Sequence, residues 1–143
     1  MLLGFRLMLI TRYAVPLWEK DIRMGSNANV YLERGITFKI EGRYEEAISE
    51  LQLLLNDDPN SSDGHYQMGL VYGFTGMFDE SLEELKHAAI LAPQRVDVRY
   101  DLAMTYTMLG EYEMAKPEFE EVLRRDPTHD KALKQLAFFD SPV

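Results

Sequence analysis

Histidines are the side chains of this sequence that most readily serve as metal ligands or proton carriers, and there are three of them, His65, His87 and His129. They stand far apart along the chain, and none has a neighbouring carboxylate at a spacing typical of a zinc site. We predict that His65 packs inside a helix pair and that His87 and His129 lie at the surface. The sequence therefore predicts no metal site and no cofactor.

Other catalytic arrangements are also missing. The chain has no cysteine, which excludes thiolate ligands, cysteine nucleophiles and disulfides. The carboxylate pair Glu83-Glu84 falls on the outward face of a predicted helix, with no cleft beside it. The glycine-rich run GLVYGFTG does not have the spacing of a phosphate-binding loop. No set of nucleophile, base and acid can be assembled, so we predict that the protein is not an enzyme.

Charge narrows the range of partners. The formal net charge is −9, so the phosphates of nucleic acid or of an anionic membrane surface would be repelled. No stretch approaches the ~20 apolar residues of a transmembrane helix, so we predict no membrane span. The absence of cysteine is compatible with a reducing compartment, and we expect a cytoplasmic protein.

The elements that position these residues repeat at a spacing of 34 residues. Residues of the same type or size recur without insertion or deletion over three consecutive copies. Matching sets are Phe38, Tyr72 and Tyr106; Gly42, Gly76 and Gly110; Tyr44, Phe78 and Tyr112; Leu51, Leu85 and Phe119; and Pro59, Pro93 and Pro127.

Each copy predicts two helices. In the middle copy, residues 65–75 carry apolar residues at helical spacing on two faces, and Gly76 ends that helix. A second helix over residues 79–91 has an apolar inner face and ends before Pro93. The small residues Gly69 and Ser81 stand where the two helices cross, which allows their backbones to approach closely.

At these positions the sequence resembles the tetratricopeptide repeat family, whose pattern places an aromatic residue, a Leu-Gly pair, Tyr, and later Ala, Phe, Ala and Pro at fixed offsets. The resemblance implies an all-α, right-handed superhelical solenoid of three helix-turn-helix repeats, at 28–61, 62–95 and 96–129, within a domain of residues 26–143. A capping helix over 130–139 is expected to cover the last repeat with Leu133, Leu136 and Ala137. Arg34 departs from the family pattern, since Leu is usual there, and Pro117 falls inside a predicted helix.

Residues 1–25 differ in kind from the rest. The segment is apolar and carries a net charge of +2. Its apolar runs are split by Arg6 and Arg12, which argues against a secretory signal. Two interpretations stay open: a helix that caps the first repeat, and a segment that occupies a groove of its own or of a neighbouring chain. Met24 is a possible native start, in which case the preceding residues have no function.

In the resembled family, the first helices of the repeats line a concave surface that binds peptides. The corresponding positions here form two sets. Nine are apolar or aromatic: Leu32, Ile36, Ile40, Tyr66, Leu70, Phe74, Tyr100, Met104 and Met108. Four form an acidic edge: Glu33, Asp63, Asp97 and Asp101.

This pattern favours an apolar ligand with basic flanks, most simply an amphipathic helix. Family members that bind the acidic tails of heat-shock chaperones use Lys, Arg and Asn to hold a terminal carboxylate, and only Asn29 matches that set here. We therefore expect a non-catalytic scaffold that binds a protein or peptide. The alternatives are a self-assembling subunit whose groove holds the N-terminal segment, forming a homo-oligomer through residues 1–25, and a regulatory domain of a separate enzyme.

Overall fold

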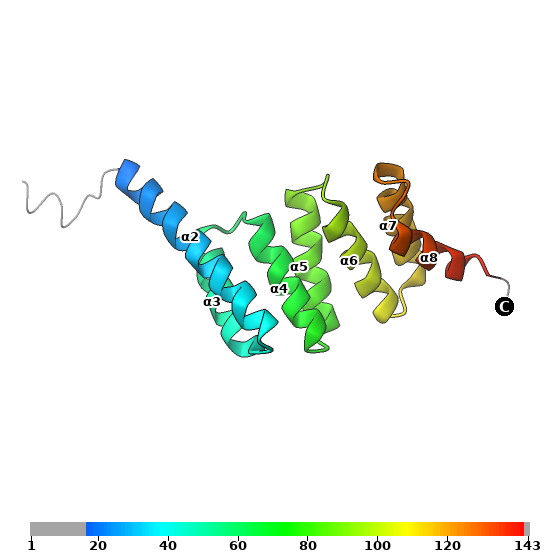
Figure 1. Cartoon of the computed structure of the whole chain (residues 1–143), viewed down its shortest axis with the longest axis horizontal. Helices are drawn as coiled ribbons and strands as arrows, with labels where there is room; N and C mark the ends of the chain where they lie inside the picture. The colour runs from blue at the N-terminus through cyan, green and yellow to red at the C-terminus, as the bar shows by residue number, and fades with distance from the viewer. Residues whose placement is uncertain (1–16, 142–143) are drawn as a thin grey trace, which may run out of the picture.

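A computed structural model of the chain describes residues 17–141 and consists, over that range, of seven helices without strands (Figure 1). They are α2 (Leu17–Ile40), α3 (Tyr44–Asp57), α4 (Ser62–Phe74), α5 (Phe78–Leu91), α6 (Val96–Met108), α7 (Tyr112–Arg125) and α8 (Asp130–Phe139).

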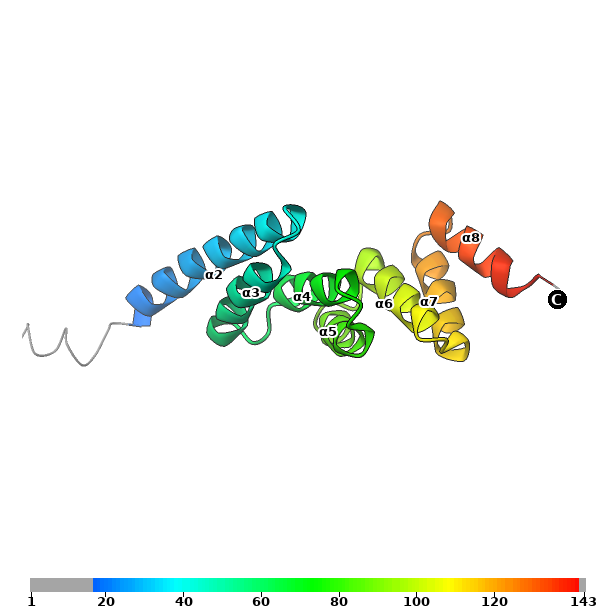
Figure 2. The ribbon, with the colours of Figure 1, turned by 90° about the horizontal axis from the view of Figure 1, so that it is seen from below.

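Consecutive helices pack in pairs: α2 with α3, α4 with α5, and α6 with α7, while α8 covers α7. The pairs stack in chain order into an arch (Figure 2), with α2 and α8 at its ends and the α4–α5 pair at its middle. The predicted all-α helical repeat solenoid is therefore confirmed. No helix among residues 17–141 has the length and hydrophobicity that a membrane span needs.

Glycine sets the turn within each pair. Gly42, Gly76 and Gly110 have φ angles of 75°, 78° and 77°, a backbone conformation that other residues rarely adopt. This confirms the prediction that Gly76 ends its helix. The repeated turn reverses the chain and brings each second helix back along the first.

Two further glycines set how closely the paired helices approach. A Cβ atom on Gly35 would lie 2.8 Å from Leu51, and one on Gly69 would lie 2.8 Å from Leu85. The Ser81 hydroxyl fits the same crossing, where it donates a hydrogen bond of 2.7 Å to the Gly69 carbonyl. The predicted role of Gly69 and Ser81 at the crossing is confirmed.

The core lies between the helices in two clusters of buried side chains. The N-terminal cluster contains Ala47, Leu51, Leu54, Met68 and Val71. The C-terminal cluster contains Leu82, Leu85, Leu102, Ala103, Tyr106, Ala115, Phe119, Val122 and Ala132. Side chains of successive pairs share each cluster, so every repeat completes the core of its neighbour.

The helix starts are set in different ways. Helix α2 runs without a break from Leu17 and so crosses the domain boundary predicted after residue 25. Helix α6 follows Arg95 and has Asp97 in its first turn. Helix α4 is capped by the Ser61 hydroxyl, which accepts a hydrogen bond from the Gly64 amide at 3.0 Å.

The capping helix α8 uses a different face from the predicted one. Leu133 is 47% exposed, and Ala137 is also exposed, so the prediction that they point inward is wrong. Ala132 is buried, and Leu136 and Phe139 pack against the C-terminal cluster, which is a face with helical spacing of four and three residues. Proposals for residues 1–16 concern a segment outside the described residues.

Candidate functional site

The nine predicted groove residues lie on α2, α4 and α6, the first helices of the three pairs, and we call them the apolar ladder. These helices are neighbours, α2 beside α4 and α4 beside α6. None of the nine is fully buried. Exposure is greatest at the last position on each helix, where Ile40, Phe74 and Met108 are 77%, 61% and 59% exposed.

The other ladder residues are half-buried and connect the surface to the core. Leu32 packs against the N-terminal cluster. Tyr66, Tyr100 and Met104 pack against the C-terminal cluster. Their inner atoms stabilise the fold while their outer atoms face solvent, so the ladder offers apolar surface on a fixed support.

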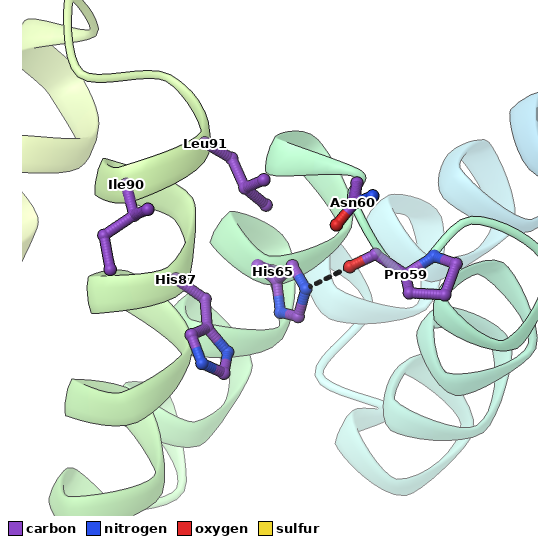
Figure 3. Close-up of a pocket in the computed structure, with 6 residues that line it drawn as sticks. All are labelled: Pro59, Asn60, His65, His87, Ile90 and Leu91. Carbon is purple, nitrogen blue, oxygen red and sulfur yellow. Dashed lines mark hydrogen bonds between the residues drawn. The ribbon is translucent and has the colours of Figure 1, made fainter.

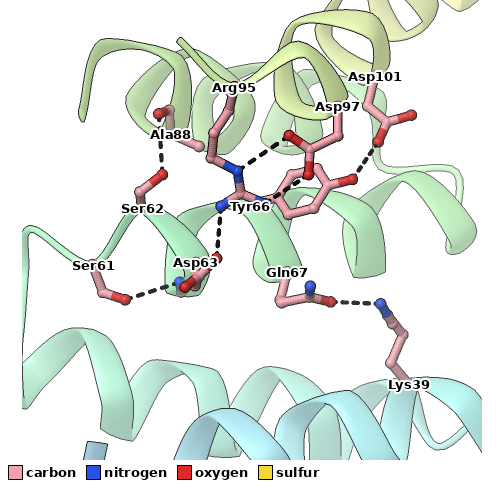
Figure 4. A network of polar contacts seen from close by, with 11 residues as sticks. Lys39, Ser61, Ser62, Asp63, Tyr66, Gln67, Ala88, Arg95, Asp97 and Asp101 are labelled. Atoms are coloured by element: carbon pink, nitrogen blue, oxygen red, sulfur yellow. Dashed lines mark hydrogen bonds and ion pairs between the residues drawn. The ribbon is translucent and has the colours of Figure 1, made fainter. Parts of the chain in front are cut away.

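The predicted acidic edge contains a basic residue that sequence reasoning missed. Arg95 forms ion pairs of 2.6 Å with Asp63 and 2.7 Å with Asp97, and its guanidinium lies 4.8 Å from the centre of the Tyr66 ring (Figure 4). The hydrogen bond from Arg95 holds the pKa of Asp97 below its usual value. Two of the four acidic groups are therefore paired within the chain.

A third acidic group, Asp101, accepts a hydrogen bond of 2.7 Å from the Tyr66 hydroxyl, which joins α6 to α4 (Figure 4). Burial raises the pKa of Asp101, and the charge of Asp97 adds to this effect, against the opposing hydrogen bond from Tyr66. Burial, followed by the bond to Asp101, also raises the pKa of Tyr66. Tyr66 thus serves both the ladder and the acidic edge.

Lys39 brings a second basic group to the same surface. Its ammonium group donates a hydrogen bond to the Gln67 side chain, which joins α2 to α4, and burial lowers the pKa of Lys39 (Figure 4). The remaining acidic residue, Glu33, is exposed. The surface therefore combines apolar positions with a polar network of both signs, rather than a uniformly acidic edge.

His87 lies at the surface as predicted, but the expectation that no histidine groups with a carboxylate is wrong for His65 and His87. His65 is half-buried near the start of α4, and His87 is exposed on α5, yet the two rings lie 5.1 Å apart, centre to centre. With Glu84 they form a group whose potential metal-ligating atoms all lie within 4.8 Å of one another. His129 lies apart from this group, and its ring nitrogen caps α8 by accepting from the Ala132 amide.

This cluster was missed from the sequence because His65 lies 19 positions before Glu84. The residues meet only because the start of α4 packs against the end of α5 in the folded pair. The available signal was Glu84 and His87 at a spacing of three residues, which places both on one helical face. Pairing that face with the start of the preceding helix would have located His65.

Comparison with known proteins agrees with this architecture. A family model described as tetratricopeptide repeat matches residues 75–137. No curated protein matches the sequence.

Solved structures match over most of the described chain. The second tetratricopeptide repeat domain of human RPAP3, in complex with the HSP70 peptide SGPTIEEVD, has a TM-score of 0.77 and 23% identity, covering 83% of this chain and 99% of that domain. The first such domain of Spaghetti (RPAP3), bound to the HSP90 peptide SRMEEVD, has a TM-score of 0.75 and 22% identity, and the match covers 78% of this chain and 89% of that domain. MamA has a TM-score of 0.71 and 24% identity, and the match covers 74% of this chain and 62% of MamA. The family model thus assigns residues 75–137 to tetratricopeptide repeats, and the solved structures share the fold of repeated helix pairs over most of the chain.

Proposed function

We propose that the chain is a non-catalytic scaffold for protein–protein interaction, and that its apolar ladder binds an amphipathic helix or an apolar peptide with basic flanks. The observation that carries this proposal is the exposure of Ile40, Phe74 and Met108 at the same place on three neighbouring helices. Apolar side chains in such a row are the anchors that a helix with residues at i, i+3, i+4 and i+7 requires.

The polar network supports the choice of flanks. The four acidic groups of the edge outnumber the two basic groups, Arg95 and Lys39, so a ligand with basic ends is favoured over one with acidic ends. The internal ion pairs of Arg95 also hold the network in one arrangement, which reduces the entropy lost on binding.

The similar domains in complex with chaperone peptides support a peptide ligand in general terms. Their peptides end in EEVD, whereas this chain presents Asp or Glu at most of the positions that would hold a terminal carboxylate. We infer that such an acidic tail is a poor ligand here.

Self-assembly through the N-terminal segment is the second candidate. The observation that favours it is the length of α2, which has 24 residues where α4 and α6 have 13 each. The additional turns precede the first repeat and extend toward residues 1–16. In this alternative, a neighbouring chain inserts that apolar segment along the ladder.

Titration with labelled peptides tests the proposal. The probe is a fluorescein-labelled helix of about 18 residues, with leucines on one face and lysines at both ends, compared with a scrambled peptide of the same composition and with SRMEEVD. Fluorescence anisotropy is expected to show saturable binding of the amphipathic peptide only. Ile40→Glu is expected to weaken that binding by about 10-fold, because it places a charge in an apolar contact.

Ile90 supplies the matched control, since it is 75% exposed, against 77% for Ile40, and lies on α5 away from the ladder. Ile90→Glu should leave the affinity within about twofold. Equal binding of the scrambled peptide, or equal loss in both variants, contradicts the proposal. Sedimentation of the full chain over a range of concentrations separates the alternative, because only self-assembly predicts a mass that increases with concentration.

A further inference from the structure

The cluster of His65, Glu84 and His87 lies away from the ladder. It is found where the start of α4 packs against the last turns of α5. There His65 and His87 lie close together beside a hollow of about 270 Å³ (Figure 3). Glu84 and His87 are one turn apart on α5, so both face α4. The potential ligand atoms of the three side chains lie within 4.8 Å of one another.

Both ring nitrogens of His65 face hydrogen-bond acceptors. Its Nδ1 lies 2.6 Å from a Glu84 carboxylate oxygen, and its Nε2 lies 2.8 Å from the Pro59 carbonyl oxygen. Both oxygens are hydrogen-bond acceptors, whereas a neutral imidazole has only one N–H to donate. A cation held between Nδ1 and the carboxylate lets the Nε2–H donate to Pro59.

We propose that His65, Glu84 and His87 form a binding site for a divalent zinc-like cation. Two imidazoles and one carboxylate are a ligand set that zinc accepts, with the fourth position open to water, while calcium and magnesium prefer oxygen ligands throughout. The Pro59 carbonyl then has the usual role of a group that orients a ligating imidazole from behind.

The required movement is small. With zinc–ligand distances of about 2.0–2.2 Å, tetrahedral ligand atoms lie about 3.4 Å apart. The present spread of up to 4.8 Å therefore has to contract by up to about 1.4 Å, and the 2.6 Å contact between His65 and Glu84 has to open by about 0.8 Å. His87 is exposed, and the adjoining hollow leaves space for a water ligand.

Calorimetric titration of the untagged full chain, freed of metal by a chelator, with zinc chloride tests the site. We expect one zinc ion per chain, and an affinity reduced about 10-fold or more by His87→Gln or Glu84→Gln. Zinc, but not magnesium, is expected to raise Tm by about 5 °C. His129→Asn is the matched control, because it removes the remaining histidine while keeping an acceptor for the Ala132 amide, and should bind zinc as the unchanged chain does.

The ring signals of the three histidines give a second measurement that needs no variant. In NMR spectra recorded during the titration, the signals of His65 and His87 should move and that of His129 should not. Saturable binding with this pattern supports the site. Absence of saturable binding up to about 1 mM zinc, or equal loss in His87→Gln and His129→Asn, overturns it.

Discussion

The second and third repeats hold the same pair of acceptor oxygens in different ways. In the third repeat, 34 residues after His65, Arg99 donates to the Glu118 carboxylate at 2.8 Å and to the Pro93 carbonyl at 3.2 Å. In the second repeat, the imidazole of His65 faces the equivalent oxygens. A guanidinium is always charged and has donors for both, whereas an imidazole needs a second proton or a metal ion.

The first repeat gives a third solution. Its equivalent carboxylate, Glu50, forms an ion pair of 3.0 Å with Arg34, and the residue at the position of His65 is Tyr31. Arg34, which departs from the family pattern, thus supplies the cation for this carboxylate. A carboxylate at this position of the second helix therefore meets a cationic or cation-binding group in each repeat, and only the second repeat can exchange its cation.

The second and third repeats also differ at the position of the second proposed zinc ligand, His87. The residue equivalent to His87 is Glu121, which forms ion pairs of 2.6 Å with Arg124 and 2.7 Å with Arg125. These bonds lower the pKa of Glu121 to about 2. The third repeat thus has no second imidazole at the place where the second repeat has one.

Removing the Arg99 guanidinium of the third repeat should have the largest effect on stability. Arg99→Ala leaves Glu118 without its partner, and the two side chains are only 18% and 25% exposed. The expected loss is about 2 kcal/mol in the free energy of unfolding, below the range for fully buried pairs. Urea unfolding monitored by circular dichroism measures it, with and without zinc.

Lys116→Ala is the control for that prediction, since its ion pair with Asp140 is 44% and 63% exposed and should contribute less than about 1 kcal/mol. Equal losses in the two variants contradict the assigned importance of the Arg99 site. Zinc should leave the loss in Arg99→Ala unchanged, because the metal binds in the other repeat.

Giving the second repeat the arginine that the third repeat has at this position should have a smaller effect on stability. His65→Arg supplies both donors permanently, and we expect a gain of about 1 kcal/mol in the free energy of unfolding in the presence of chelator. The same change should abolish the zinc-induced rise in Tm. Thermal unfolding with and without zinc measures both effects, and a variant that keeps the rise argues against His65 as a ligand.

The sequence predicted the architecture from features that repeat, and missed features that depend on one pair of helices. Gly42, Gly76 and Gly110 recur every 34 residues because each hairpin needs the same positive φ angle. The capping helix does not form a full repeat that could be compared with the others. Its apolar residues lie on more than one face, and only one of these faces packs against the core. The inward face predicted for this helix is therefore wrong, and the apolar side chain of Phe138 is 72% exposed.

The candidate site was predictable only in part for the same reason. Ladder residues could be placed on their helices by counting from the repeat. Arg95 and Glu84 act across gaps between helices, where pairing depends on the side-chain conformation and on the loop between them. Arg95 precedes α6, in a loop position that the helical pattern does not describe.

The smallest expected effect concerns the acidic edge beside the ladder, where Asp101 in the third repeat is equivalent to Gln67 in the second. Burial raises the pKa of Asp101, so the folded state binds its proton more tightly than the unfolded state does. The resulting stability is present below the ordinary Asp pKa and is lost as the pH rises through the raised folded value. At neutral pH the charged carboxylate is therefore a cost.

Asp101→Asn keeps an oxygen that accepts from Tyr66 but has no charge to bury, which makes the third repeat resemble the second. We expect the variant to be more stable than the unchanged chain by about 0.5 kcal/mol at pH 7, allowing for solvent screening. The difference should shrink as the pH falls, because the unchanged chain then gains a proton at Asp101. Urea unfolding at a series of pH values measures this difference, and a variant that is less stable at pH 7 means that the charged hydrogen bond from Tyr66 outweighs the cost of burial.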